Sequence, residues 1–212
     1  MSIATLAAAI AGAIVGILAD RLSARWPAHA ATSPPRGLGW RTVVLALIGA
    51  AAFGALQQQF TEPRDVAVLA IYFAALVILA ATDLDQKLLP DLITLPLIGF
   101  ALVAVILGWD PLLADKQLGL ISGIVMGIVA PLFLIVTDRL LGGGLGFGDV
   151  KLAVGLGLMS GVTRLVGGFL IASVGFSVVL VLLIAFRRIG LKSAIPFGPV
   201  LICAGFIGAF LS

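Results

Sequence analysis

Long apolar stretches separated by short polar junctions make up most of this chain. Stretches of about 17–22 apolar residues are long enough to cross the roughly 30 Å hydrocarbon core of a bilayer as helices. We predict spans over residues 3–19, 42–59, 66–82, 92–109, 118–137, 152–161, 165–186 and 194–212. The sixth is short, and we expect it to be partial or tilted. The pattern therefore predicts an all-α integral membrane protein, a bundle of about eight transmembrane helices.

The composition agrees with a membrane location. Hydrophobic residues make up 61% of the 212 residues and charged residues only 11%, whereas a soluble domain has about 25% charged residues. The 26 glycines suit closely packed membrane helices. Cys203 and His29 are each the sole residue of their type. They allow no internal disulfide and no zinc site, and we expect neither a metal nor another cofactor.

The positive charges predict how the helices cross the membrane. No charged residue precedes Asp20, so we read residues 1–22 as a retained first transmembrane helix with its N-terminus outside. Residues 23–41 are then a short basic cytoplasmic loop. With this orientation, ten Lys and Arg residues lie inside and three outside. We attribute the net charge of +3 to such loops, and we expect a lipid bilayer and no nucleic acid as partner.

Acidic residues gather at two junctions between apolar stretches. One is ATDLDQKLLPDLITL, residues 81–95, and the other is LGGGLGFGDVKL, residues 141–152. An Asp in a membrane helix costs roughly 2.5–3.5 kcal/mol at the helix centre, so such residues are candidates for function. Both junctions fall on the predicted cytoplasmic side. We expect the remaining acids to be solvated helix ends: Asp20, Glu62, Asp65, Asp110, Asp115 and Asp138.

Two neighbouring carboxyl groups can carry out peptide hydrolysis. When they lie about 3 Å apart, the two groups cannot both ionise, and they therefore share one proton. Such a pair can deprotonate a water for attack on a peptide carbonyl and then protonate the leaving amine. A Ser/His/Asp triad would need His29 in a proline-rich loop, and the glycines match no nucleotide-binding motif. A transporter or scaffold that uses the acid pair for protons or ions is the alternative, and the short sixth span is its best support.

Three segments together resemble a known family. They are DLDQKLLPDLIT from Asp83, GFGDVKLAVGLG from Gly146 and IPFGP over residues 195–199. In this order they resemble type IV prepilin peptidases, which are GxGD membrane aspartyl proteases, over about residues 66–212. The resemblance implies an aspartic endopeptidase with Asp83 and Asp149 as its catalytic residues. Residues 42–212 would be the membrane-embedded peptidase domain. Another GxGD protease, cutting within transmembrane helices, remains an alternative.

The resemblance also implies a substrate and a location. Enzymes of this kind remove the short basic leader of prepilins and pseudopilins at the cytoplasmic face of a prokaryotic plasma membrane. Larger family members carry a Cys-rich insert between the first two helices, associated with N-methylation of the cleaved pilin. Here that loop has about 20 residues and no Cys. We therefore expect peptidase activity without methyltransferase activity.

Several residues near the two acids have supporting interpretations. Asp85 is the main rival of Asp83, although it faces elsewhere if the helix continues past Asp83. Lys151 is expected to hold substrate, to tune the acid pair, or to extend to the membrane surface. Pro90 and Asp91 are expected to begin the fourth helix. A peptide strand is expected to pass close to Gly146 and Gly148. Residues 196–199 are expected to form a bent helix entry near the site.

Overall fold

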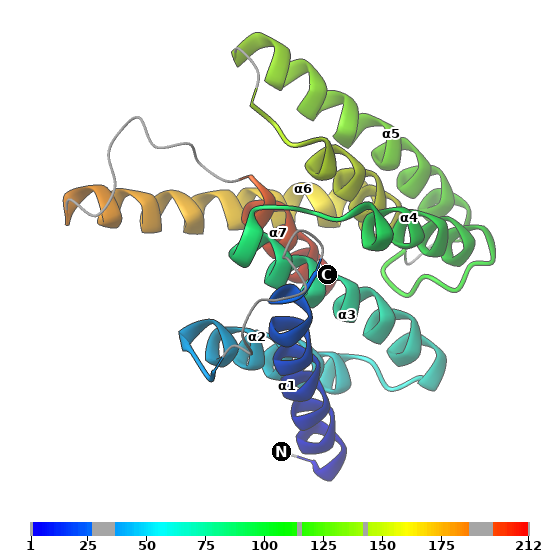
Figure 1. Ribbon diagram of the computed structural model, residues 1–212. Helices are drawn as coiled ribbons and strands as arrows, with labels where there is room; N and C mark the ends of the chain where they lie inside the picture. The colour runs from blue at the N-terminus through cyan, green and yellow to red at the C-terminus, as the bar shows by residue number, and fades with distance from the viewer. Residues whose placement is uncertain (1, 27–36, 114–115, 142–143, 187–196, 212) are drawn as a thin grey trace.

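The protein is a bundle of helices. The computed structural model describes residues 2–26, 37–113, 116–141, 144–186 and 197–211, which contain seven α-helices and no strand. The helices, shown in Figure 1, are α1 (Ile3–Ser23), α2 (Trp40–Gln59), α3 (Pro63–Gln86), α4 (Asp91–Ile106), α5 (Lys116–Leu141), α6 (Phe147–Ala185) and α7 (Gly198–Phe210). Five are long and apolar enough to cross a membrane, and α4 and α7 are shorter apolar helices. The predicted all-helical membrane class is confirmed.

The predicted eight helices are not confirmed, and neither is the outside N-terminus. Two predicted spans, 152–161 and 165–186, both fall within α6, whose 39 residues form two helical segments joined by a kink. Its only non-helical backbone lies at Gly161, with φ 63° and ψ −170°, a conformation that a side chain would strain. The amide of Val162, freed by this break, donates to Ser122 Oγ at 2.9 Å. A single glycine therefore bends the chain where the sequence pattern predicted a connecting loop.

The helix α3 forms the centre of the bundle and packs against α1, α2 and α7. Its side chains Leu69, Tyr72, Phe73 and Leu76 are inaccessible to solvent. The Phe73 ring lies 5.2 Å from the ring of Phe206 in α7, measured between centroids. Within a lipid bilayer the hydrophobic effect does not drive helices together, so helix association depends on close van der Waals packing of this kind. Because α3 is packed on several sides, the positions of Asp83 and Asp85 near its C-terminal end are restrained by the neighbouring helices.

Small residues let neighbouring helices touch through their backbones. A Cβ atom placed on Gly12 of α1 would lie 2.1 Å from the carbonyl oxygen of Gly49 in α2. A Cβ on Gly168 of α6 would lie 2.4 Å from the Ala204 oxygen in α7. The glycines at these positions therefore allow close contact between helices, as the high glycine content of the sequence predicted.

Contacts between helix ends define one end of the bundle, which we call the aspartate end. The C-terminal ends of α1 and α3 and the N-terminal ends of α2, α4, α6 and α7 meet there. The contacts that join them involve Ser23, Arg41, Asp83, Asp85, Gln86, Asp91, Lys151 and Gly198. The residues His29, Asp115 and Pro196, for which the sequence analysis made predictions, lie outside the described residues.

Candidate active site

Asp83 lies in the last turn of α3. The helix ends there because Lys87 adopts a left-handed conformation, with φ 54°, and its N–H donates to the Asp83 carbonyl at 2.9 Å. Pro90 follows and favours an extended chain before the next helix. The Asp83 residue is only 8% exposed. The helix end therefore places this carboxyl at the border of the core.

Asp149 lies in the first turn of α6, directly after the glycine-rich segment. Gly146 precedes the helix as its N-cap, and a Cβ placed on Gly146 would lie 3.1 Å from Asp149 Oδ2. A carboxylate in the first helical turn is favoured by the free backbone N–H groups there. Asp149 and Asp83 interact electrostatically. The structure thus places the two acids of the predicted pair within electrostatic range of each other.

A third segment closes against the acid pair. Gly198 begins α7, and a Cβ placed on it would lie 2.7 Å from Asp83 Oδ1 and 3.0 Å from Asp83 Cγ. Any side chain at position 198 would collide with the Asp83 carboxyl, so the position of this carboxyl depends on a glycine there. The expected helix entry near the site is therefore in direct contact with it, a closer role than the sequence indicated. The prolines and glycine of residues 196–199 indicate a bent helix entry, but this pattern does not reveal that Asp83 is the residue packed against Gly198.

Gly146 and Gly148 differ in their surroundings. Gly146 is exposed beside Asp149, where a peptide has access to its backbone. A Cβ placed on Gly148 would lie 2.8 Å from Leu89 Cβ and 2.9 Å from the Leu89 oxygen. The close approach at Gly148 is thus to the connection between α3 and α4. Gly146 remains the better candidate for a substrate contact.

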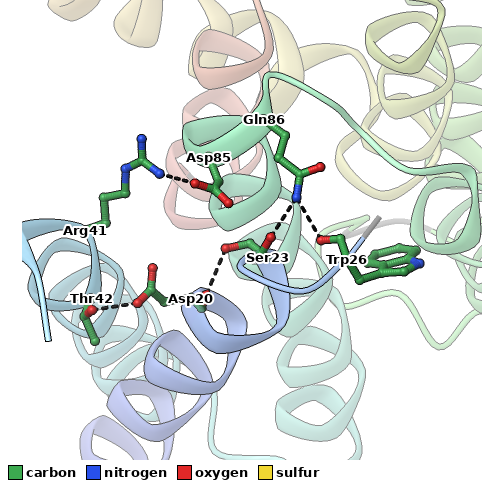
Figure 2. A network of polar contacts seen from close by, with 7 residues as sticks. All are labelled: Asp20, Ser23, Trp26, Arg41, Thr42, Asp85 and Gln86. Carbon is green, nitrogen blue, oxygen red and sulfur yellow. Dashed lines mark hydrogen bonds and ion pairs between the residues drawn. The ribbon is translucent and has the colours of Figure 1, made fainter. Parts of the chain in front are cut away.

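Asp85 points to a different part of the bundle than Asp83. Figure 2 shows its carboxyl facing Arg41 of α2, with which it forms an ion pair. The Asp85 side chain is 3% exposed. Successive helical residues are about 100° apart around the axis, so residues two positions apart face nearly opposite sides. The rival acid is therefore engaged away from Asp149. No local pattern in the sequence identifies Arg41 as its partner.

Lys151 and Asp91 form an ion pair between α6 and α4. Lys151 Nζ donates to both carboxyl oxygens of Asp91, at 2.6 and 2.7 Å. Asp91 begins α4 with Pro90 as its N-cap, which agrees with the predicted helix start. The lysine also lies 5.2 Å from the centroid of the Phe147 ring. This pair joins the helix starts beside the acids, an arrangement the sequence did not predict.

Two acids expected to be solvated are buried instead, so that expectation is wrong for them. Asp20 is 1% exposed, and its Oδ2 accepts a hydrogen bond from Thr42 Oγ1 at 2.6 Å. Asp110, after α4, is 6% exposed and accepts from the Leu112 N–H at 2.9 Å. Burial raises the pKa of Asp110 to about 7, although the Leu112 N–H and the charge of Arg164 act in the opposite direction. Hydropathy patterns do not reveal such burial in a turn.

The arrangement at the aspartate end suits proton transfer. Asp83 and Asp149 are two acids that interact electrostatically, from helices distant in the sequence, and Gly146 precedes Asp149 as the N-cap of its helix. One such group can accept a proton from water while the other donates one. Within the described ranges, no three His, Cys, Asp or Glu side chains gather as metal ligands would. The site's distinctive chemistry is thus that of its paired carboxyls.

The chain is similar to known proteins over most of its length. A model of the type IV leader peptidase family matches residues 70–211. Three similar curated proteins are each named prepilin leader peptidase/N-methyltransferase. That of Pseudomonas putida is 38% identical over 135 residues, covering 63% of this chain and 46% of the relative. That of Pseudomonas aeruginosa is 30% identical over 171 residues, covering 80% and 58%. That of Burkholderia pseudomallei is 33% identical over 175 residues, covering 81% and 54%.

The matches cover a larger share of this chain than of its relatives. The chain spans about half the length of the curated relatives it matches. The family match includes the ends of α3, α6 and α7 that meet at the acid pair. No solved structure matches the chain.

Proposed function

Because the chain belongs to the type IV leader peptidase family, we propose that it removes the short leader of prepilin-like precursors with an aspartyl mechanism. The observation that carries this proposal is the pairing of Asp83 with Asp149. The substrate class comes from the names of the relatives, which are prepilin leader peptidases. The lipid bilayer is the second partner, because five helices are suited to cross it.

In the proposed reaction the two carboxyls share one proton and hold a water between them. The ionised carboxyl takes a proton from the water as its oxygen attacks the peptide carbonyl. The protonated carboxyl donates its proton to that carbonyl oxygen, which gives a neutral tetrahedral intermediate. The newly protonated carboxyl then gives its proton to the leaving amine as the C–N bond breaks, while the other carboxyl takes a proton from a hydroxyl of the intermediate. The acid pair again holds one proton, as at the start.

We place the acid pair near the cytoplasmic face of a prokaryotic plasma membrane. The ten-to-three distribution of Lys and Arg supports this orientation. The meeting of helix ends at the aspartate end agrees with it, since α1 and α3 would both finish on that side. We further propose that peptidase activity occurs without methyltransferase activity. A matured pilin methylated by the purified protein with S-adenosylmethionine would contradict this second proposal.

A cleavage assay tests the proposal. Membranes that contain the wild-type chain or single variants are mixed with a prepilin from the same genome, and leader loss is followed by mass. Asp83→Asn and Asp149→Asn are each expected to lower the rate by about 1,000-fold or more, because each removes one group of an acting pair. Asp85→Asn is the matched variant two residues away, and it is expected to retain measurable cleavage.

The outcomes separate the candidate functions. Full cleavage by Asp83→Asn or Asp149→Asn would exclude this acid pair as the catalyst. If the wild type also cuts within unrelated transmembrane helices, the broader GxGD protease reading is correct. The break in α6 does not favour transport at the acid pair. It lies at Gly161, 12 residues and about 18 Å along the helix from Asp149.

A further inference from the structure

The last turn of α3 is held by the pair of helices α1 and α2. Arg41, the second residue of α2, donates through Nη1 to Asp85 Oδ1 (Figure 2). The Asp85 side chain is 3% exposed and that of Arg41 is 30% exposed. Removing one partner of a buried ion pair leaves the other charge without compensation, which is strongly unfavourable. The pair therefore ties the rotation of this turn to α2.

A neighbouring residue ties the same turn to α1. Gln86 Nε2 donates to the carbonyl oxygens of Ser23, at 2.7 Å, and Trp26, at 3.1 Å. Carbonyls at a helix C-terminus have no partner within the helix, and a side-chain amide can satisfy them. Figure 2 shows both contacts beside the Arg41–Asp85 pair. Two consecutive residues of α3 are thus fixed to different helices.

Asp83 lies in this same turn but faces the other way. Its carboxyl is packed against Gly198, with 2.7 Å from Oδ1 to the place where a Cβ would lie, and it interacts with Asp149. The turn ends at Lys87, whose N–H bonds to the Asp83 carbonyl. One short turn carries Asp83 and Asp85 on nearly opposite sides. A rotation of this turn about the helix axis that breaks the Asp85 contact therefore also moves the Asp83 carboxyl.

We propose that Arg41, acting through Asp85, is a positioning residue that holds the Asp83 carboxyl in register with Asp149. This rests on the proposed function, in which these two acids do the chemistry. Arg41 does not contact the acid pair in this arrangement, and its effect passes through the last turn of α3. The start of α2, outside the 70–211 region matched by the family model, thereby takes part in the geometry of the site.

Kinetics of leader cleavage provide the first test. Arg41→Gln and Asp85→Asn are each expected to lower kcat about 10–100-fold, since small misplacements of reacting groups have effects of this size. KM is expected to stay within about threefold, because substrate contacts are not removed. The double variant is expected to be no slower than the slower single variant, because both changes remove the same contact. Arg41→Lys, which keeps the charge, is expected to recover most of the lost rate.

A matched control lies at the opposite end of α3. Arg64 pairs with Asp65 at 3.2 Å, and its side chain is 61% exposed. Arg64→Gln removes an Arg–Asp pair from the same helix and is expected to cleave at the wild-type rate. Folded fraction is measured for each variant by size exclusion and thermal unfolding in detergent. A loss of kcat that follows only the loss of folded protein would overturn the positioning role.

A second measurement is independent of cleavage. With Cys203→Ala as background, Asp83→Cys and Asp149→Cys are joined by a short thiol-reactive cross-linker in membranes. Adding Arg41→Gln is expected to slow cross-linking several-fold, whereas adding Arg64→Gln is expected to leave it unchanged. Equal cross-linking rates with and without Arg41→Gln would refute the proposal. If the wild type cleaves no precursor, the proposed function fails, and the cross-linking rates still decide whether Arg41 positions this turn.

Discussion

Asp83 and Asp110 are both buried acids, at opposite ends of the bundle, and their surroundings differ. Asp83 is 8% exposed and faces Asp149, which comes from a helix distant in the sequence. Asp110 is 6% exposed, and its nearest hydrogen bond, from the Leu112 N–H at 2.9 Å, comes from two residues away. The charge of Arg164 further favours its ionised form. Both acids interact with another carboxyl, but Asp110 also closes a local turn beside a guanidinium, whereas Asp83 is packed against the glycine that begins α7.

This comparison shows that burial alone does not identify a reactive acid. Both residues lose water, which disfavours the charged form in each. Each also interacts with a second carboxyl, Asp149 for Asp83 and Asp65 for Asp110. What distinguishes Asp83 is the glycine backbone of Gly198 packed against its carboxyl. Asp110 has a backbone donor and a nearby guanidinium, which is how a turn satisfies a buried carboxyl. The functional difference therefore lies in which groups replace the lost water.

The largest effect in this comparison is expected from a methyl group placed next to Asp83. Gly198→Ala puts a Cβ 2.7 Å from Asp83 Oδ1, a distance that forces the carboxyl or the start of α7 to move. We expect kcat for leader cleavage to fall about 10–100-fold, because the acid pair is displaced. Gly99→Ala in α4 is the control, since a Cβ there has no neighbour within 4 Å. Equal rates for both variants would show that Asp83 tolerates displacement.

An intermediate effect is expected at Asp110, in stability and not in catalysis. In the folded protein its pKa is about 7, above its ordinary value of 3.8. Between these values the folded state binds more protons than the unfolded state, so stability falls as pH rises from about 4 to about 7. The slope is at most about 1.4 kcal/mol per pH unit. Asp110→Asn is expected to remove the contribution of Asp110 to this slope, and so to reduce it, and to leave cleavage within about threefold of wild type.

Thermal unfolding of the purified protein at a series of pH values measures this slope. Glu62→Gln is the control, because it removes an exposed acid outside both sites. It is expected to keep the wild-type slope. Loss of cleavage in Asp110→Asn would contradict the distinction between the two buried acids, and an unchanged slope would contradict the raised pKa.

The smallest effect is expected from the ion pair beside the acids. Lys151→Ala breaks the contact with Asp91, whose side chain is 60% exposed. Such pairs contribute about 0–1 kcal/mol, so we expect cleavage to fall about two- to threefold. Initial rates at low and at high salt measure it, since added salt screens the wild-type pair and reduces the difference between the two proteins. A loss of 100-fold or more would instead give Lys151 a direct part in the reaction.

The sequence allowed the helical class and the pairing of the two acidic junctions to be predicted. Long apolar stretches force helices in a bilayer, because every backbone polar group must be satisfied within the chain. The pairing came from the cost of placing Asp83 and Asp149 beside apolar spans and from the family's motifs. Both arguments depend on local sequence; the helical class is confirmed, and the pairing of the acids stays a prediction.

Other features depend on contacts between distant residues and could not be predicted. The Arg41–Asp85 pair joins residues 44 positions apart, and no local pattern distinguishes Arg41 from other loop bases. The break at Gly161 resembled a loop because glycine and polar residues end apolar stretches in either case. The burial of Asp20 and Asp110 depends on which helices cover these turns, which is a tertiary property.

The lengths of α4 and α7 have a consequence for the lipids around the acid pair. With 16 and 13 residues, these helices are about 24 and 20 Å long, shorter than the roughly 30 Å of hydrocarbon in an ordinary bilayer. The segment of α6 from Phe147 to the break at Gly161, which carries Asp149 in its first turn, is similarly short. A bilayer can accommodate helices of this length by thinning beside them. Under the proposed function, such thinning would shorten the apolar path between the acid pair and the water and precursor that have to reach it.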